Sequence, residues 1–199
     1  MKDTTIVDLL RHGEPLGGRR YRGQIDDPLS ENGWREMWHA VSGETPWQQI
    51  ISSPLRRCSE FAQALSEKLD IPISQDDRLK EVGFGAWEGK TGAELRLLDP
   101  DILARFYEDP ITHRPQGAEP LHQFSERVNN ALQSAISTHQ GKHLLVIAHA
   151  GVIRAILTHA LSAPLLSMYR LSIATASLSR LQLGGERPPT VLFHSRTRL

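Results

Sequence analysis

Short apolar runs alternate along the chain with longer segments in which apolar residues recur every three or four positions. The short runs predict buried strands, and the recurring spacing predicts helices with one face turned to a core. Strands are expected at residues 6–10, 49–52, 71–74, 144–148, 177–183 and 190–194. Helices are expected at 30–41, 53–69, 91–98, 100–107, 118–139 and 151–161.

This alternation predicts an α/β protein with three α/β/α layers and a mostly parallel central sheet. The last two strands flank a Gly-Gly-Glu-Arg-Pro-Pro segment, which predicts a terminal hairpin at an edge of the sheet. The 199 residues contain neither a visible linker nor a repeat, so residues 1–199 are expected to form a single domain.

Composition narrows the choice of partners. The formal net charge is +0, so no overall field favours nucleic acid or an anionic membrane. No apolar run approaches the roughly 20 residues of a membrane span. We therefore expect a cytoplasmic enzyme that acts on a small molecule, and the sequence leaves its oligomeric state open.

Candidate chemistry lies where the expected strands end. Arg11, His12 and a glycine follow the first strand, and His149 with two small residues follows the strand at 144–148. Arg56 follows the strand at 49–52, in the first turn of a helix. Open α/β sheets bind ligands at these carboxyl ends, and the helix after His149 would aim free N–H groups there. Any one of these residues alone is more often structural, but together they predict a pocket for a dianion such as phosphate.

The combination of motifs resembles the histidine phosphatase superfamily, which has the phosphoglycerate mutase-like fold. The motifs are Arg-His-Gly at 11–13, Ser-Pro-Leu-Arg at 53–56, Glu-x-x-Phe-Gly-x-Trp-Glu-Gly at 81–89 and His-x-Gly-Val-Ile-Arg at 149–154. Matching segments extend from Leu9 to Arg154 and cover most of the chain.

The resemblance implies a role for each matching residue. His12 would attack phosphorus and form a phosphohistidine. Glu81 would protonate the leaving oxygen and then activate the hydrolytic water. The phosphate oxygens would be held by Arg11, Arg56 and His149. An imidazole has an ordinary pKa of about 6.5, so a neutral histidine is available as a nucleophile near pH 7.

Further residues of the family pattern are assigned to the substrate. These are Arg22, Gly23 and Gln24 in a basic loop, and Ala150, which stands where relatives usually have glycine. Pro15 departs from the pattern as well, because many relatives have a hydroxyl residue there. Neither a metal nor a cofactor is implied, since guanidinium and imidazole groups supply the positive charge.

The chain is short for a mutase, which must exclude water and hold a second phosphate, so a phosphatase is expected. Within the family it looks most like the α-ribazole phosphatases of cobalamin biosynthesis, through residues 17–29, 54–58 and 176–181. Residues 91–116 are expected to form the wall that meets the rest of the substrate. The alternatives are a broad-specificity phosphatase, a phosphoglycerate mutase, a metal-dependent hydrolase and a catalytically silent module that binds phospho-ligands.

Overall fold

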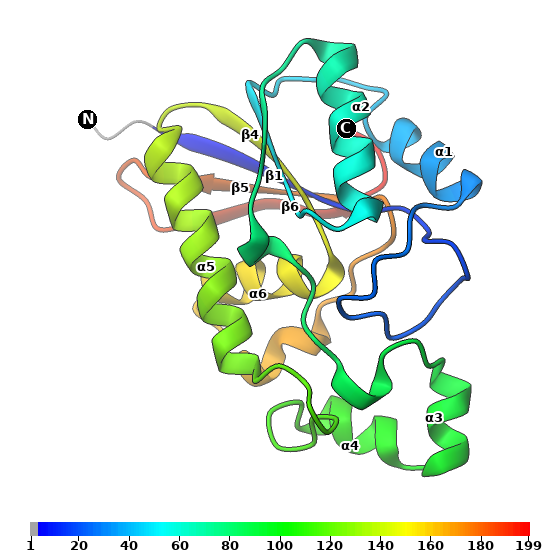
Figure 1. The fold of residues 1–199 in the computed structure, drawn as a ribbon. Helices are drawn as coiled ribbons and strands as arrows, with labels where there is room; N and C mark the ends of the chain where they lie inside the picture. Colours follow the sequence, from blue (N-terminus) through cyan, green and yellow to red (C-terminus); the bar gives the residue numbers. More distant parts are fainter. Residues whose placement is uncertain (1–3) are drawn as a thin grey trace.

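The computed structural model describes residues 4–199, and within them six strands form one sheet in the order β3-β2-β4-β1-β5-β6 (Figure 1). The strands are β1 (Thr5–Arg11), β2 (Gln49–Ser52), β3 (Ile73–Gln75), β4 (His143–Ala148), β5 (Leu178–Leu183) and β6 (Thr190–Arg196). β1 and β4 are the two innermost strands. Most of their residues are buried, including every residue from Val7 to Leu10 and from Leu144 to Ala148, as expected for strands covered on both faces.

The sheet is mostly parallel, as predicted. β3, β2, β4 and β1 run in one direction, whereas β5 pairs antiparallel with β1 and β6 pairs antiparallel with β5. The terminal hairpin predicted from the Gly-Gly-Glu-Arg-Pro-Pro segment is therefore present, and β6 forms one edge of the sheet.

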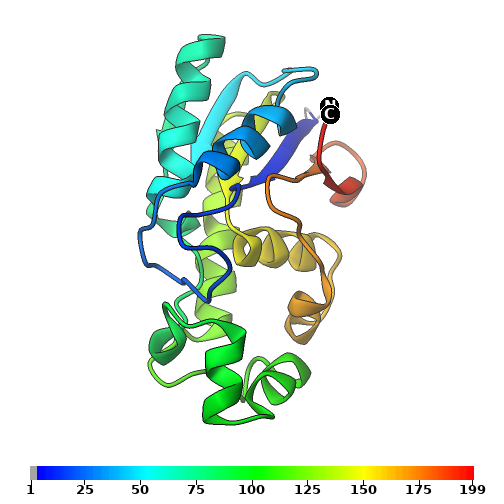
Figure 2. The ribbon, with the colours of Figure 1, turned by 90° about the vertical axis from the view of Figure 1, so that its right-hand side faces the viewer.

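Helices cover both faces of the sheet and produce the expected three layers (Figures 1 and 2). One core joins the sheet to α5 and α6, and a second joins it to α1 and α2. The α-helices of the described residues are α1 (Glu31–Ala40), α2 (Arg56–Leu69), α3 (Gly92–Leu98), α4 (Ile102–Glu108), α5 (Leu121–Thr138) and α6 (Ala150–Ala160).

A lobe built from α3 and α4 lies at one end of the molecule, away from α1 and α2 (Figure 2). Aromatic side chains pack the lobe against neighbouring segments of the protein. The ring of Phe106 in α4 lies 5.1 Å from that of Trp87 and 4.8 Å from that of Tyr169. Trp87 and Tyr169 belong to two short 3-10 helices, η2 (Gly85–Trp87) and η3 (Leu165–Arg170), which the apolar spacing did not predict.

The expected elements are all present, with ends displaced by at most three residues. The starts of α2 and α5 are each displaced by three residues. The displacement of α2, which was expected to start at Ser53, has a physical cause. The Ser53 N–H still pairs with the Ile147 carbonyl as a continuation of β2, so the helix begins only at Arg56. The Ser53 hydroxyl accepts from the Leu55 N–H at 3.3 Å and bonds to His149, but the N-cap of α2 is Leu55 and not Ser53.

Within residues 4–199, no helix combines the length and apolar character needed to cross a bilayer.

Candidate active site

The two histidines predicted at strand ends lie together. β1 and β4 are parallel neighbours, and Arg11 is opposite Ala148 in their register. His12 and His149 therefore follow the carboxyl ends of adjacent strands, on the same side of the sheet. Their ring centroids are 5.2 Å apart and the planes meet edge to face. The side chains that follow these two strands therefore lie side by side, as expected.

His12 is oriented by its own backbone. Its Nδ1 lies 2.7 Å from the Gly13 carbonyl oxygen, which can only accept a hydrogen bond. Nδ1 therefore carries the proton, and the lone pair is on Nε2. Burial lowers the pKa of His12 well below its ordinary value, and the charges of Arg11 and Arg57 lower it further. The lowered pKa favours a neutral ring at pH 7, with an unprotonated Nε2.

Two arginines flank His12. One η nitrogen of Arg11 donates to the Ile173 carbonyl at 2.6 Å, and burial lowers the pKa of this guanidinium to about 10. The second arginine is Arg57, which is 1% exposed and donates to the carbonyls of Ile25 and Gly23. Three of its five N–H groups bond to protein, including the one that meets His149, which leaves two for a ligand.

Arg56, which was expected at the phosphate, lies outside the cavity lining, and its neighbour Arg57 lines the cavity instead. The Arg56 side chain is 53% exposed and forms an ion pair with Glu60, one helical turn away. The helical period explains the difference. Arg56 lies opposite the apolar face of α2, whereas Arg57 lies at the edge of that face and reaches inward.

His149 is fully buried beneath His12 and Arg57. Arg57 Nε donates to its Nδ1 at 3.2 Å, and its Nε2 lies 2.7 Å from the Ser53 hydroxyl. Because an arginine only donates, Nδ1 is the unprotonated nitrogen and Nε2–H donates to Ser53. Burial lowers the pKa of His149 well below its ordinary value, with a further contribution from Arg57.

Glu81 faces the cavity with both carboxylate oxygens held by backbone N–H groups. Oε1 accepts from Val82 at 2.9 Å, and Oε2 accepts from Gly151 at 3.1 Å in the first turn of α6. A β-carbon at residue 151 would collide with this carboxylate, so glycine permits the close approach. The helix amino end thus fixes the carboxylate in the cavity that His12 also lines.

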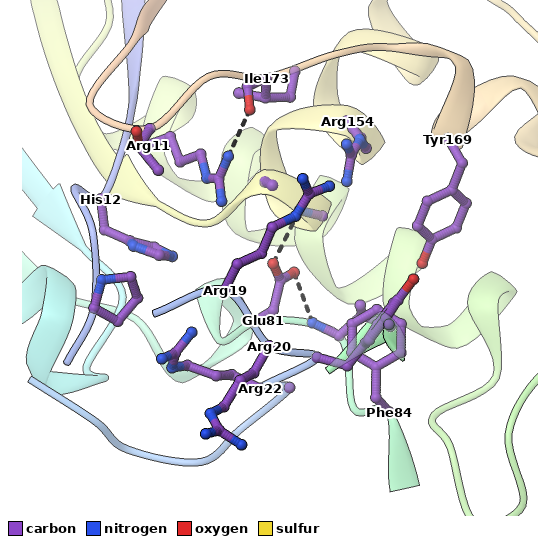
Figure 3. Close-up of a pocket in the computed structure, with 18 of the residues that line it drawn as sticks. Arg11, His12, Arg19, Arg20, Arg22, Glu81, Phe84, Arg154, Tyr169 and Ile173 are labelled. Carbon is purple, nitrogen blue, oxygen red and sulfur yellow. Dashed lines mark hydrogen bonds between the residues drawn. The ribbon is translucent and has the colours of Figure 1, made fainter. Parts of the chain in front are cut away.

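The cavity has a volume of about 790 Å³ (Figure 3). Within the described residues its charged lining comprises two glutamates, Glu14 and Glu81, and seven arginines, at 11, 19, 20, 22, 57, 96 and 154. Most of the hydrogen bonds that hold these arginines are to backbone carbonyls, as when Arg154 donates to Leu171 at 2.8 Å. Their charge is therefore left to act on the cavity, which favours an anionic ligand.

The residues predicted to contact substrate separate into two groups. Arg22, Gly23 and Ala150 line the cavity. Arg22 is itself held by Asp27 at 2.9 Å and by the Leu16 carbonyl, and Gly23 uses its carbonyl to hold Arg57. Gln24 lies outside the cavity lining and donates from its side chain to the Glu81 carbonyl at 3.3 Å, so it supports the Glu81 loop.

The segment expected to form the substrate wall does reach the cavity, through Gly92, Ala93, Arg96, Leu103 and Tyr107.

The cavity residues that were not anticipated from the sequence include Arg57, Arg154 and Tyr169. Arg154 lies one turn after Ala150 on α6, and helical spacing could have placed it on the same side. Tyr169 belongs to η3 and carried no signal, because a short 3-10 helix has no lasting apolar period.

Across residues 4–199, no three histidine, cysteine or carboxylate side chains come together in a way that could hold a metal ion.

The end of β1 directs Arg11 and His12 into a cavity that is lined mainly by cationic side chains. An α/β fold with such a cavity is typical of proteins that act on phosphate groups. The chain belongs to the histidine phosphatase superfamily (branch 1), whose family model matches residues 7–195.

Individual relatives extend this finding. A protein of Mycobacterium tuberculosis named as bifunctional is 35% identical over 180 residues, which are 88% of this chain and 49% of the relative. The chain thus spans about half the length of the first curated relatives it matches. The structure of a mycobacterial glucosyl-3-phosphoglycerate phosphatase superposes with a TM-score of 0.86 at 25% identity, covering 96% of this chain and 99% of the other.

The α-ribazole phosphatase of Shigella flexneri shares the fold, with a TM-score of 0.82 at 20% identity over 98% of each chain.

Proposed function

We propose that this chain hydrolyses phosphate monoesters through a phosphohistidine on His12. The observation that carries the proposal is the bond from His12 Nδ1–H to the Gly13 carbonyl, which leaves the Nε2 lone pair as the reactive atom. A lowered pKa keeps this ring neutral beside two guanidinium groups. Such an arrangement positions the nucleophile and stabilises charge on the phosphoryl group, which are the main requirements of phosphoryl transfer.

The reaction has two steps. In the first, Nε2 of His12 forms a bond to phosphorus while the ester P–O bond breaks, and Glu81 gives its proton to the leaving oxygen. In the second, the Glu81 carboxylate takes a proton from a water molecule whose oxygen attacks phosphorus, and the P–N bond breaks. Inorganic phosphate leaves, and both side chains return to their starting protonation states.

Arg11 and Arg57 would hold the phosphate oxygens, and His149 would act on the phosphate by orienting Arg57. This division of roles follows the geometry. The two arginines line the cavity, whereas the His149 ring lies behind them with both nitrogens already bonded to protein.

A phosphatase fits this chain better than a mutase. A mutase must exclude water from its phosphoenzyme and hold a second phosphate, and the short segment between Gly89 and Gly117 supplies few basic residues for that task. A product that retains the phosphate, formed from a phosphoglycerate, would favour the mutase instead.

For the substrate, we propose α-ribazole 5′-phosphate, and with it a cytoplasmic role in cobalamin biosynthesis. Support comes from the resemblance at residues 17–29, 54–58 and 176–181. Aromatic side chains at the cavity, Tyr21, Phe84, Tyr107 and Tyr169, offer the apolar surface that a heterocyclic base requires. A broad-specificity phosphatase of small esters is the alternative, and kcat/KM compared across α-ribazole phosphate, phosphoglycerates and an aryl phosphate decides between them.

The covalent step is tested by rapid acid quench with an ester labelled on phosphorus. Acid-labile label on the wild-type chain, and none on a His12→Ala variant, is the expected result. Turnover without trapped label on the wild-type chain would refute the phosphohistidine. An absence of turnover with every ester would favour the silent binding module, and activity that disappears with a chelator would favour a metal-dependent hydrolase.

A further inference from the structure

The loop that carries Glu81 is held from behind by one side chain of α5. Arg127 donates from one η nitrogen to the carbonyls of Arg78 and Lys80, at 2.6 and 2.8 Å. Its other η nitrogen donates to the Glu81 carbonyl at 3.1 Å. A single guanidinium therefore fixes three carbonyl oxygens of the segment that positions the Glu81 carboxylate.

Glu119 completes this contact. Its two oxygens accept from Arg127, from Nε at 2.6 Å and from an η nitrogen at 2.8 Å. One of them also accepts from the Gly83 N–H at 3.1 Å, and the Glu119 backbone N–H donates to the Gly83 carbonyl at 3.1 Å. The pair thus holds the loop on both sides of Glu81.

Arg127 has no donor left over. Its five N–H groups match the five hydrogen bonds to Arg78, Lys80, Glu81 and Glu119. The side chains of Arg127 and Glu119 are only 21% and 19% exposed, so water screens the pair weakly. A guanidinium used in this way cannot bind substrate, which distinguishes it from the arginines of the cavity.

We propose that Arg127 and Glu119 are positioning residues for the proton transfers of Glu81. The inference rests on the proposed role of Glu81 as the acid. Without the pair, the loop is free to shift, and the carboxylate loses its alignment with the leaving oxygen. Displacements of about 1 Å at a catalytic group cost on the order of a hundredfold in rate.

The leaving group provides a readout that a purely structural role would not change. An alkoxide must be protonated as it leaves, whereas p-nitrophenolate leaves without a proton. The quantity to compare is kcat/KM, which reports the steps up to the phosphoenzyme, for glycerol 3-phosphate and p-nitrophenyl phosphate. In Arg127→Gln, we expect a fall of about ten- to a hundredfold with the alkyl ester and less than about threefold with the aryl ester.

Two further variants are needed, one as a control and one as a second test of the pair. Arg180→Gln removes another arginine that binds a carboxylate with two hydrogen bonds, at Asp8, outside the cavity lining. It should change both esters by the same factor. Glu119→Gln keeps the shape of the side chain while removing its charge, and we expect the same selective loss at a smaller size. Glu119→Gln takes the place of Arg127→Gln as the test variant if Arg127→Gln does not fold.

The selectivity of the three variants distinguishes a failure of the positioning role from a failure of Glu81 as the acid. If Glu81→Gln loses the alkyl ester selectively but Arg127→Gln and Glu119→Gln affect both esters equally, the positioning role is refuted and the proposed acid stands. If Glu81→Gln itself shows no selectivity, Glu81 is not the acid and the proposed function must be revised. Selective loss in all three variants confirms both.

Discussion

Nε of Arg57 lies 3.2 Å from Nδ1 of His149, and this contact is compatible only with a neutral His149 ring. A protonated ring would place two N–H donors against each other. The two residues come from α2 and from the end of β4, so their contact links the helix start to the centre of the sheet. It also fixes the orientation of Arg57, which lines the cavity.

The first prediction contrasts the neighbouring arginines of α2. Arg57→Ala should lower kcat/KM by about a hundredfold or more, because it removes a buried charge at the developing phosphoryl charge. Arg56→Ala should change kcat/KM by less than about twofold, since its side chain is exposed and paired with Glu60. Both variants would be assayed with p-nitrophenyl phosphate, and circular dichroism would confirm folding. Equal losses would contradict the assignment of Arg57.

The second prediction concerns the buried hydroxyl of Ser53. Ser53→Ala leaves the Nε2–H of His149 without its acceptor, which should cost about 1–3 kcal/mol of unfolding free energy. We also expect kcat to fall, because the freed imidazole no longer holds Arg57 in one orientation.

Ser52→Ala is the matched control, since it removes a fully buried hydroxyl one residue earlier that bonds only to the Ser53 carbonyl. Nitrogen NMR of the His149 ring provides the specific readout. An unchanged ring spectrum in Ser53→Ala, together with a loss of kcat no larger than that of Ser52→Ala, would show that Ser53 does not position the ring.

The third prediction is a pH dependence. His12 must be neutral to attack, and its pKa is lowered well below the ordinary 6.5 by burial and by Arg11 and Arg57. The free enzyme should therefore keep a neutral His12 as the pH falls through 6.5, and lose it only at lower pH. A nitrogen NMR titration of His12 in the free enzyme measures this directly and avoids ionisation of the substrate. A midpoint near 6.5 would contradict the buried, cationic environment.

The fourth prediction tests the approach of Glu81 to α6. Gly151→Ala places a methyl group where the carboxylate lies, so Glu81 must move away from its backbone donors. We expect a loss of about tenfold or more with an alkyl phosphate and little change with p-nitrophenyl phosphate. The melting temperature should not fall much, because alanine has the higher helix propensity. A loss of the same size with both esters would indicate a general distortion of α6.

Much of the fold could be predicted from the apolar pattern. The strands that became β1 and β4 are short, almost wholly apolar runs, and such runs specify buried parallel strands directly. The helix ends were harder to predict. Ser53 followed by proline has the form of a helix start, but the tertiary contact with His149 takes its hydroxyl, and local signals carry no information about that contact.

Site residues that follow a strand end could be predicted from the sequence, whereas site residues in loops and helices were harder to predict. His12 and His149 followed from the sheet, whereas Glu81 lies in a loop and was identified only by its resemblance to the family pattern. The helical phase of α2 places Arg57, and not Arg56, at the cavity, and the apolar face of α2 contains that information. Tyr169 reaches the cavity from η3, which no periodicity marks.

The pairing of β1 with β4 also sets the order in which the molecule can come apart. These strands are flanked by β2 on one side and β5 on the other, so each is paired along both of its edges. Amide exchange in folded proteins is slowest in such central strands. Fluctuations that open the β5–β6 hairpin or the α3–α4 lobe would leave the imidazoles side by side, and the two histidines would stay in contact until global unfolding.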